Sequence, residues 1–264
     1  MQQAINIPDS SNQMLSDQLQ FDEAANRLKN IVSHTPLQLN LNLSRRYQCN
    51  VYLKREDLQV VRSYKLRGAY NMMSSLSEEQ RQRGVVCASA GNHAQGFAYS
   101  CKKLGIRGVV FMPIITPGQK VSQTRMFGED HIEVKLVGDN FDDCAVAAKK
   151  YTADHDMVFI PPFDDLRIIE GQGTVAVEIL NDLSDIDYLF VPVGGGGLAA
   201  GVGRYFQLYS PGTRIIGIEP EGAPSMSEAL NNGYPVTLDS IDRFVDGAAV
   251  KRVGDLTFSI CKDV

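Results

Sequence analysis

The sequence predicts an α/β protein with parallel sheets. From residue 21 onward, short apolar runs alternate with longer stretches that have helical spacing. Several of the runs are apolar throughout, as expected for strands that are covered by helices on both faces. The chain has 264 residues, of which 44% are hydrophobic and 22% charged, so it is long enough for one large or two modest domains.

The predicted elements follow one another in order along the chain. The first helix covers residues 21–32, where the apolar residues fall on one face, and Pro36 prevents it from continuing. The expected strands are 51–54, 85–89, 108–113, 133–137, 157–160, 188–193 and 214–219, and the expected later helices are 65–75, 92–104, 117–127, 141–154, 168–182 and 198–209. Ligands of such folds bind beyond the carboxyl ends of the strands.

Charge and composition exclude several classes of protein. With 26 basic and 31 acidic residues the net charge is −5, which argues against a nucleic-acid or anionic-membrane partner. The five cysteines and four histidines are scattered without metal-ligand or redox spacing, which favours reduced thiols in a cytoplasmic protein and no metal site. The sequence begins without a signal-peptide pattern and has no apolar run of membrane-spanning length.

Four consecutive glycines, Gly194 to Gly197, lie between an apolar run and a helical stretch. A strand-to-helix turn without Cβ atoms exposes backbone N–H groups at a helix N-terminus, and such a turn binds phosphate. The same run fits a dinucleotide fingerprint, because Glu219 ends the next strand 22 residues after Gly197, where a ribose-binding acid belongs. A nicotinamide-dependent oxidoreductase that uses Gly195, Gly197 and Glu219 is therefore an alternative, although it gives the next two motifs no role.

Lys65 stands at the start of a predicted helix, in a stretch where five residues between 54 and 67 are basic. Neighbouring cations and a helix N-terminus lower the pKa of a lysine, which favours the neutral amine that a Schiff base requires. Residues 87–96 run from a strand into another helix, and their Ser89, Asn92 and His93 suit a substrate carboxylate. Taken singly, the two motifs are better explained as a solvated basic helix end and a capped helix start.

Together the motifs resemble the signatures of the threonine/serine dehydratases (ammonia-lyases), which are pyridoxal-phosphate enzymes of the tryptophan-synthase-β fold, fold type II. The matching segments are Ser63–Ala69, Ser89–His93 and Gly194–Leu198, flanked by Thr35–Leu37, Lys54–Leu58 and Gly171–Thr174, and the match spans residues 22–264. Residues 1–20 are polar and show no period, which predicts a flexible tail. For the rest of the chain we expect a large cofactor-binding domain (21–75 plus 162–264) and a small domain (76–161).

The resemblance also implies a role for each motif. Lys65 would be the catalytic lysine that forms the Schiff base with pyridoxal 5'-phosphate. The ring would be bound by Tyr64 and Asn92, and the phosphate by Gly194, Gly195, Gly196, Gly197 and Leu198. The substrate carboxylate would be received by Ser89, Ala90, Gly91, Asn92 and His93. The expected reaction converts L-threonine, and L-serine, to a 2-oxo acid and ammonia, as in isoleucine biosynthesis.

The sequence departs from the family pattern at three places. Ala90 stands where related serine racemases have a serine, which favours elimination over racemisation. Glu219, Ala223 and Ser225 resemble a cation site of some relatives, but Ser225 replaces an acid, so a weakly bound cation is the most that we expect. Relatives continue past the equivalent of Val264 to a motif that partners the pyridine nitrogen. We therefore expect a truncated chain, and a cofactor-binding module without turnover is a second alternative. The resemblance also implies a homo-oligomer, a dimer or a tetramer.

Overall fold

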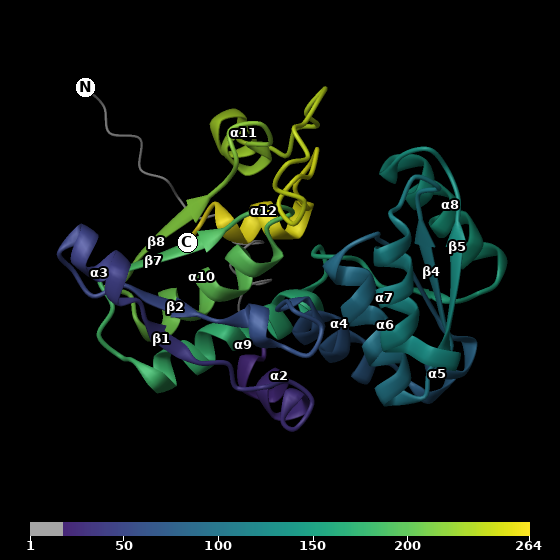
Figure 1. Cartoon of the computed structure of the whole chain (residues 1–264), viewed down its shortest axis with the longest axis horizontal. Coiled ribbons are helices and arrows are strands. Elements are labelled where there is room, and N and C mark those ends of the chain that lie inside the picture. Colours follow the sequence, from purple (N-terminus) through teal and green to yellow (C-terminus); the bar gives the residue numbers. More distant parts are fainter. Residues whose placement is uncertain (1–17) are drawn as a thin grey trace.

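The computed structural model describes residues 18–264 (Figure 1). Residues 1–17, most of the predicted tail, lie outside the described residues. Leu19, near the end of that tail, is buried in the hydrophobic core. The amide N–H of Gln20 donates a hydrogen bond of 3.1 Å to Glu170 Oε1. The chain therefore packs on the core before the first helix begins.

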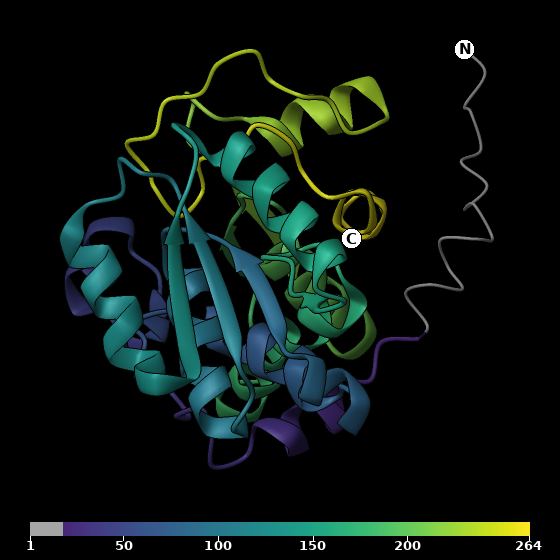
Figure 2. The same cartoon turned by 90° about the vertical axis from the view of Figure 1, so that its right-hand side faces the viewer.

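A four-stranded parallel sheet has the order β5-β4-β3-β6. Its strands are β3 (Val85–Ala88), β4 (Gly108–Met112), β5 (Ile132–Leu136) and β6 (Val158–Phe159). The surrounding helices are α5 (Glu78–Arg83), α6 (Asn92–Leu104), α7 (Gly118–Gly128) and α8 (Phe141–Asp154), with the 3-10 turn η2 (Glu129–His131). Figure 2 shows the strands side by side between these helices.

Alternate residues of β3 pack into two different clusters. Val85 and Cys87 belong to the cluster that contains Phe97 of α6, whereas Val86 and Ala88 belong to the cluster with Cys144 of α8. Because both faces of the sheet are buried, its strands are apolar at consecutive positions. The continuous apolar runs in the sequence are explained by this arrangement.

The remaining elements surround two smaller sheets (Figure 1). A parallel pair joins β7 (Tyr188–Pro192) to β8 (Arg214–Ile218), and an antiparallel pair joins β1 (Leu37–Leu39) to β2 (Tyr52–Lys54). The helical elements are α2 (Phe21–Leu28), α3 (Leu41–Tyr47), η1 (Glu56–Leu58), α4 (Lys65–Ser74), α9 (Leu166–Asp182), α10 (Gly197–Tyr209), α11 (Ser225–Asn232) and α12 (Asp255–Cys261). Within residues 18–264, no helix is both long and apolar enough to cross a bilayer.

Helix α4 lies between α6 and α9, and glycines permit its close approach to both. A Cβ atom at Gly96 of α6 would lie 2.9 Å from the backbone nitrogen of Leu66. A Cβ atom at Gly171 of α9 would lie 2.6 Å from the carbonyl oxygen of Arg67. Only glycine tolerates such contacts, so the first turn of α4, where Lys65 stands, is held tightly from two sides.

Candidate active site

Lys65 is the first residue of α4, and its amine points to the loop that follows β6. Its Nζ donates a hydrogen bond of 2.8 Å to the carbonyl oxygen of Pro162. Burial lowers the pKa of Lys65 to about 8. The sequence predicts a lowered pKa, and the direction is confirmed, but the cause is desolvation and not the neighbouring cations. A substantial fraction of the amine is therefore neutral near physiological pH, as a nucleophile requires.

The glycine run forms the turn between β7 and α10, as predicted. Gly196 is the N-cap of α10 and has a φ of +93°, which favours glycine. Within residues 18–264, the amide N–H groups of Gly194 to Leu198 donate no hydrogen bond to the protein. Several unpaired N–H groups at a helix N-terminus are the donor set that a phosphate requires.

The side chain of Phe163 links the lysine to the glycine run. The Lys65 Nζ lies 5.9 Å from the centroid of the Phe163 ring. The same ring packs so closely on Gly195 that a Cβ atom there would overlap it. A Cβ atom at Gly197 would lie 3.0 Å from the Cβ of Phe163. The amine and the phosphate-type turn therefore both lie close to the side chain of Phe163.

The predicted carboxylate loop, Ser89 to His93, leads into the N-terminus of α6. The amide N–H of Gly91 donates to Ser89 Oγ over 3.2 Å, which shapes the turn. Asn92 is exposed at the first position of α6 and lines a cavity of about 360 Å³ together with Arg62 and Gln95. Ala90 packs at the edge of the core beneath α6. The loop thus presents a polar helix start next to an open volume.

His93 is buried, and its ring is occupied by a structural contact. Its Nε2 lies 3.0 Å from the carbonyl oxygen of Ile160, which can only accept, so Nε2 carries the proton. Burial, with a smaller contribution from the charge of Lys65, lowers the pKa of His93 to about 3. The ring therefore stays neutral at physiological pH.

Tyr64 lies beside the amine on the side of the large core. Its ring centroid is 5.6 Å from Lys65 Nζ, and burial raises the pKa of Tyr64 to about 12. Ser63, one residue earlier, is buried, and its hydroxyl has no hydrogen-bond partner in the described part of the chain. Leu198 packs against the core on the α10 side. These positions leave the amine flanked by aromatic rings.

Glu219 does not have the role that a dinucleotide site would give it. Its carboxylate accepts hydrogen bonds from the amide groups of Met226 (2.7 Å) and Ser227 (2.8 Å), so it caps α11. The structure therefore gives no support to the oxidoreductase alternative, because its ribose ligand is already used. Ala223 is buried just before α11, and Ser225 is buried at its first position. Residues 18–264 hold no cluster of three or more His, Cys, Asp or Glu side chains suited to a metal. A weak cation site there stays a prediction.

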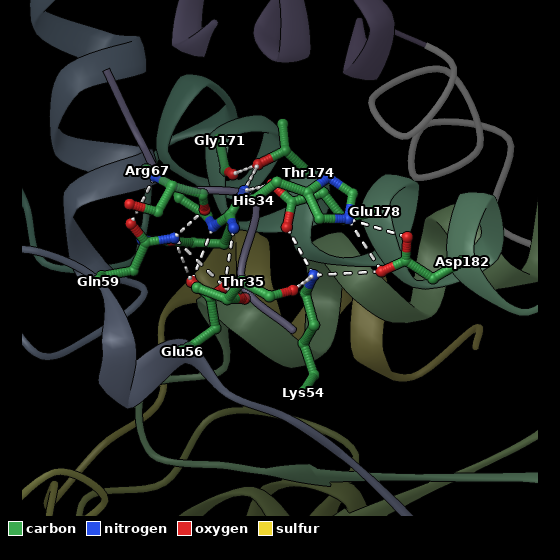
Figure 3. Close-up of polar contacts among 12 residues, drawn as sticks. His34, Thr35, Lys54, Glu56, Gln59, Arg67, Gly171, Thr174, Glu178 and Asp182 are labelled. Carbon is green, nitrogen blue, oxygen red and sulfur yellow. Dashed lines mark hydrogen bonds and ion pairs between the residues drawn. The ribbon is translucent and has the colours of Figure 1, made fainter. Parts of the chain in front are cut away.

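The flanking motifs form a buried cluster beneath α4 (Figure 3). Arg67 donates to both carboxylate oxygens of Glu56 (2.8 and 2.7 Å) and to Glu178 (2.7 Å). Lys54 pairs with Glu178 over 2.6 Å, and the Thr35 hydroxyl donates to Glu56 over 2.6 Å. Burial alone would raise the pKa of Glu178, but hydrogen bonds and charge from Arg67 and Lys54 lower it below its usual value. Two cations and two carboxylates thus neutralise one another.

The segment that follows β6 contributes to the site but carries no recognisable motif. Pro161-Pro162 and Asp164-Asp165 are visible in the sequence only as an interruption of the strand–helix pattern. In the structure this segment supplies the Pro162 carbonyl to Lys65 and the Phe163 ring to the glycine run. Its contacts join residues that are far apart in the chain, and no local pattern carries that information.

The comparisons agree with this geometry. The family model described as "Pyridoxal-phosphate dependent enzyme" matches residues 28–264, and the chain belongs to this family. Enzymes of this class depend on pyridoxal phosphate. The unpaired amides of the glycine run and the buried amine of Lys65 fit a ligand with one anionic and one electrophilic end.

Individual relatives show which pyridoxal-phosphate enzymes the chain is similar to. Biosynthetic L-threonine dehydratase IlvA of Halalkalibacterium halodurans is 58% identical over 238 residues, which are 90% of this chain and 57% of that protein. The processed form of threonine deaminase isoform 2 from Solanum lycopersicum has a TM-score of 0.85 at 45% identity, over 92% of this chain and 72% of that one. Maize serine racemase has a TM-score of 0.86 at 31% identity, over 92% and 73%. The fold is therefore that of fold type II.

The chain spans less than two thirds of the curated relatives that it matches. The IlvA proteins of Halalkalibacterium halodurans and of Staphylococcus aureus strain NCTC 8325 are covered over 57% and 59% of their lengths. The fold and the cofactor class follow from the family. The substrate, the activity and the assembly are matters of proposal.

Proposed function

We propose that this chain binds pyridoxal 5'-phosphate through Lys65 and the glycine run, and that the enzyme it forms is a threonine ammonia-lyase. It converts L-threonine to 2-oxobutanoate and ammonia, and L-serine to pyruvate and ammonia. The observation that carries the proposal is the common contact of the Lys65 amine and Gly195 with the Phe163 ring. The names of the relatives, threonine dehydratase and threonine deaminase, support the choice of substrate.

Each predicted site residue receives a role in this proposal. The amides of Gly194, Gly195, Gly196, Gly197 and Leu198 bind the phosphate, and the positive end of the α10 dipole adds to the attraction. Tyr64 packs beside the ring, and Asn92 donates to its hydroxyl. The start of α6 and the residues that lead into it, Ser89, Ala90, Gly91, Asn92 and His93, receive the substrate carboxylate at this helix N-terminus.

Lys65 is the catalytic base in this proposal. When bound, pyridoxal phosphate supplies an electron sink that acidifies the Cα–H bond of an attached amino acid. The Lys65 amine, whose pKa burial lowers to about 8, accepts that proton in its neutral form. The Pro162 carbonyl oxygen holds the free amine in place, because it accepts a hydrogen bond of 2.8 Å from Lys65 Nζ. The rings of Tyr64 and Phe163 exclude water from its two sides.

The proposal also covers the domain organisation of the chain, its cellular location and its oligomeric state. The four-stranded sheet lies within residues 76–161, and the two smaller sheets lie in residues 21–75 and 162–264, which supports a small and a large domain with these bounds. We propose the cytoplasm as its location, since all five cysteines are free thiols. A homo-oligomer, dimer or tetramer, is part of the same proposal, and light scattering of the purified chain measures it.

An assay of 2-oxo acid release tests the activity. We expect the purified chain, saturated with pyridoxal phosphate, to form 2-oxobutanoate from L-threonine. Lys65→Ala should abolish turnover, because the covalent attachment and the base are both lost. The exposed Lys150, which pairs with Asp154, gives a matched control, and Lys150→Ala should leave the rate unchanged. A chain that binds the cofactor at Lys65 but releases no 2-oxo acid would be a binding module, and the proposed activity would be wrong.

A further inference from the structure

The carbonyl groups of the glycine run are held by the last helix, α12. Thr257 is fully buried, and its hydroxyl donates a hydrogen bond of 2.6 Å to the carbonyl oxygen of Gly195. The amide N–H of Gly254 donates to the same oxygen over 3.3 Å. A Cβ atom at Gly196 would lie 2.8 Å from Thr257 Cβ, so α12 packs directly on the turn. One side of the glycine run is therefore fixed by this helix.

Helix α12 is in turn fixed by Asp164. The Asp164 carboxylate accepts hydrogen bonds from the amide groups of Asp255 (3.0 Å), Leu256 (3.0 Å) and Thr257 (3.1 Å). A carboxylate that accepts from the free N–H groups of a first helical turn is a strong cap. Asp164 follows Phe163, whose ring packs on Gly195 from another side. The segment that orients the lysine amine thus also orients α12.

This arrangement decides where the amides of the glycine run point. The chain has no cis peptide bond among the described residues. In a trans peptide the C=O of one residue and the N–H of the next point in opposite directions. With the Gly195 carbonyl directed at Thr257, the Gly196 N–H is directed away from α12, and it donates to no group in the described structure. The hydrogen bond to Thr257 therefore presents the Gly196 N–H to a ligand.

We propose that Thr257 is a positioning residue for the cofactor phosphate, and that Asp164 supports it through α12. The inference rests on the proposed function, because it takes the phosphate as the ligand of the glycine run. The contacts of the Thr257 hydroxyl are with backbone carbonyls, those of Gly195 and Gly254, so its effect is confined to the phosphate end. A loss of the hydroxyl should weaken phosphate binding and leave the attachment to Lys65 intact.

The test compares two aldehydes that differ only in the phosphate. Binding of pyridoxal 5'-phosphate and of pyridoxal to Lys65 is titrated by absorbance in the chain and in Thr257→Val, Thr257→Ser and Thr124→Val. Thr124 is a matched control: it is buried, and its hydroxyl donates to a backbone carbonyl, that of Lys120, over 3.0 Å, in α7. Asp164→Asn is a second variant that weakens the cap of α12 without a change of size.

We expect Thr257→Val to raise the Kd of pyridoxal phosphate about three- to tenfold, the usual effect of one lost hydrogen bond. The Kd of pyridoxal should change less than about twofold, and Thr257→Ser should keep the affinity of the unchanged chain. Asp164→Asn should show the same selective loss, and Thr124→Val should show none.

Three other outcomes would contradict either the positioning role of Thr257 or the proposed function. If Thr257→Val and Asp164→Asn bind pyridoxal phosphate as tightly as the unchanged chain, the positioning role is wrong. The role is equally wrong if the two aldehydes lose affinity to the same extent, because the effect is then one of general stability. If the unchanged chain attaches neither aldehyde at Lys65, the proposed function itself fails, and the inference fails with it.

Discussion

The polar side chains beneath α4 have hydrogen-bond partners within the protein, whereas the amide groups of the glycine run donate to no group among the described residues. In the cluster of Figure 3, Arg67 is 1% exposed, yet hydrogen bonds to Glu56, Glu178 and Thr174 satisfy its guanidinium. In the glycine run, the amides from Gly194 to Leu198 have no partner among the groups described. The protein thus pairs its structural charges internally and leaves the amide donors of the glycine run free for the ligand that we propose.

The two regions are joined through α4. Lys65 and Arg67 lie two residues apart on its first turn, so a structure that fixes Arg67 also fixes the start of the helix. The cluster links η1, β2 and α9 to this turn, and Lys54 donates to the Thr35 carbonyl over 2.7 Å. A buried ion pair contributes little net stability, but it is costly to break from one side. The cluster therefore contributes more to the position of the first turn of α4 than to the net free energy of unfolding.

The largest expected effect follows from breaking the paired region. Arg67→Ala removes the cation of Glu56 and leaves Lys54 as the remaining partner of Glu178 in a buried setting, and we expect it to lower the free energy of unfolding by about 3–5 kcal/mol. Denaturant titration measures the loss. Arg55→Ala is the matched control, because Arg55 makes a bidentate pair with Asp57 at the surface, and it should leave the midpoint nearly unchanged. Equal losses in the two variants would contradict the contrast between the two regions.

A smaller effect is expected from a change in the unpaired region. Gly196→Ala places a Cβ at a φ of +93°, and we expect a loss of about 1–2 kcal/mol in stability together with a weakened affinity for pyridoxal phosphate. Gly105 is a matched control, since it also has a positive φ (+66°) but has no neighbouring atom within 4 Å of the place that a Cβ would occupy. Gly105→Ala should cost stability alone. If the two variants lose cofactor affinity equally, the glycine run is not the phosphate site.

The smallest expected effect is the dependence of the rate of cofactor attachment on pH, which tests whether the Lys65 amine is buried. Only the neutral amine attacks the cofactor aldehyde, and burial lowers the pKa of Lys65 to about 8. The rate of attachment should rise about tenfold per pH unit below pH 8, because the protonated fraction falls, and should level off above it. An exposed lysine, with a pKa of about 10.4, would keep rising beyond pH 9. A stopped-flow pH series that rises without a plateau up to pH 10 would show that the amine is not buried.

The sequence predicted most of the fold where periodicity is strong. Helices α6, α8 and α10 and the strands of the four-stranded sheet lie within a residue or two of their expected ranges. The first helix ends at Leu28 and not at residue 32, because the chain turns through a positive φ at Asn30. The elements β1, α3, α5, α11 and α12 were not predicted. Helix α3 has no buried residue and therefore no apolar stripe, whereas α5 could have been found from its capping box at Ser77 and Gln80.

The site was predictable where a local pattern carries chemistry. Lys65 at a helix start and glycines between a strand and a helix are visible in the sequence, and the structure has both features. The contacts of Pro162 with Lys65 and of Thr257 with Gly195 could not be predicted from the sequence, because they join residues that are 97 and 62 positions apart. A backbone carbonyl that accepts from a lysine has no signature in the sequence. Such contacts require the tertiary structure.

The central claim is that one ligand reaches both the Lys65 amine and the glycine run. Borohydride reduction of the chain with pyridoxal phosphate, followed by peptide mapping, tests it most directly. We expect a single phosphopyridoxyl group on the peptide that contains Lys65, and a large drop in its yield for Gly196→Ala but not for Gly105→Ala. Labelling spread over surface lysines, or a yield at Lys65 that is unchanged by Gly196→Ala, would contradict the account.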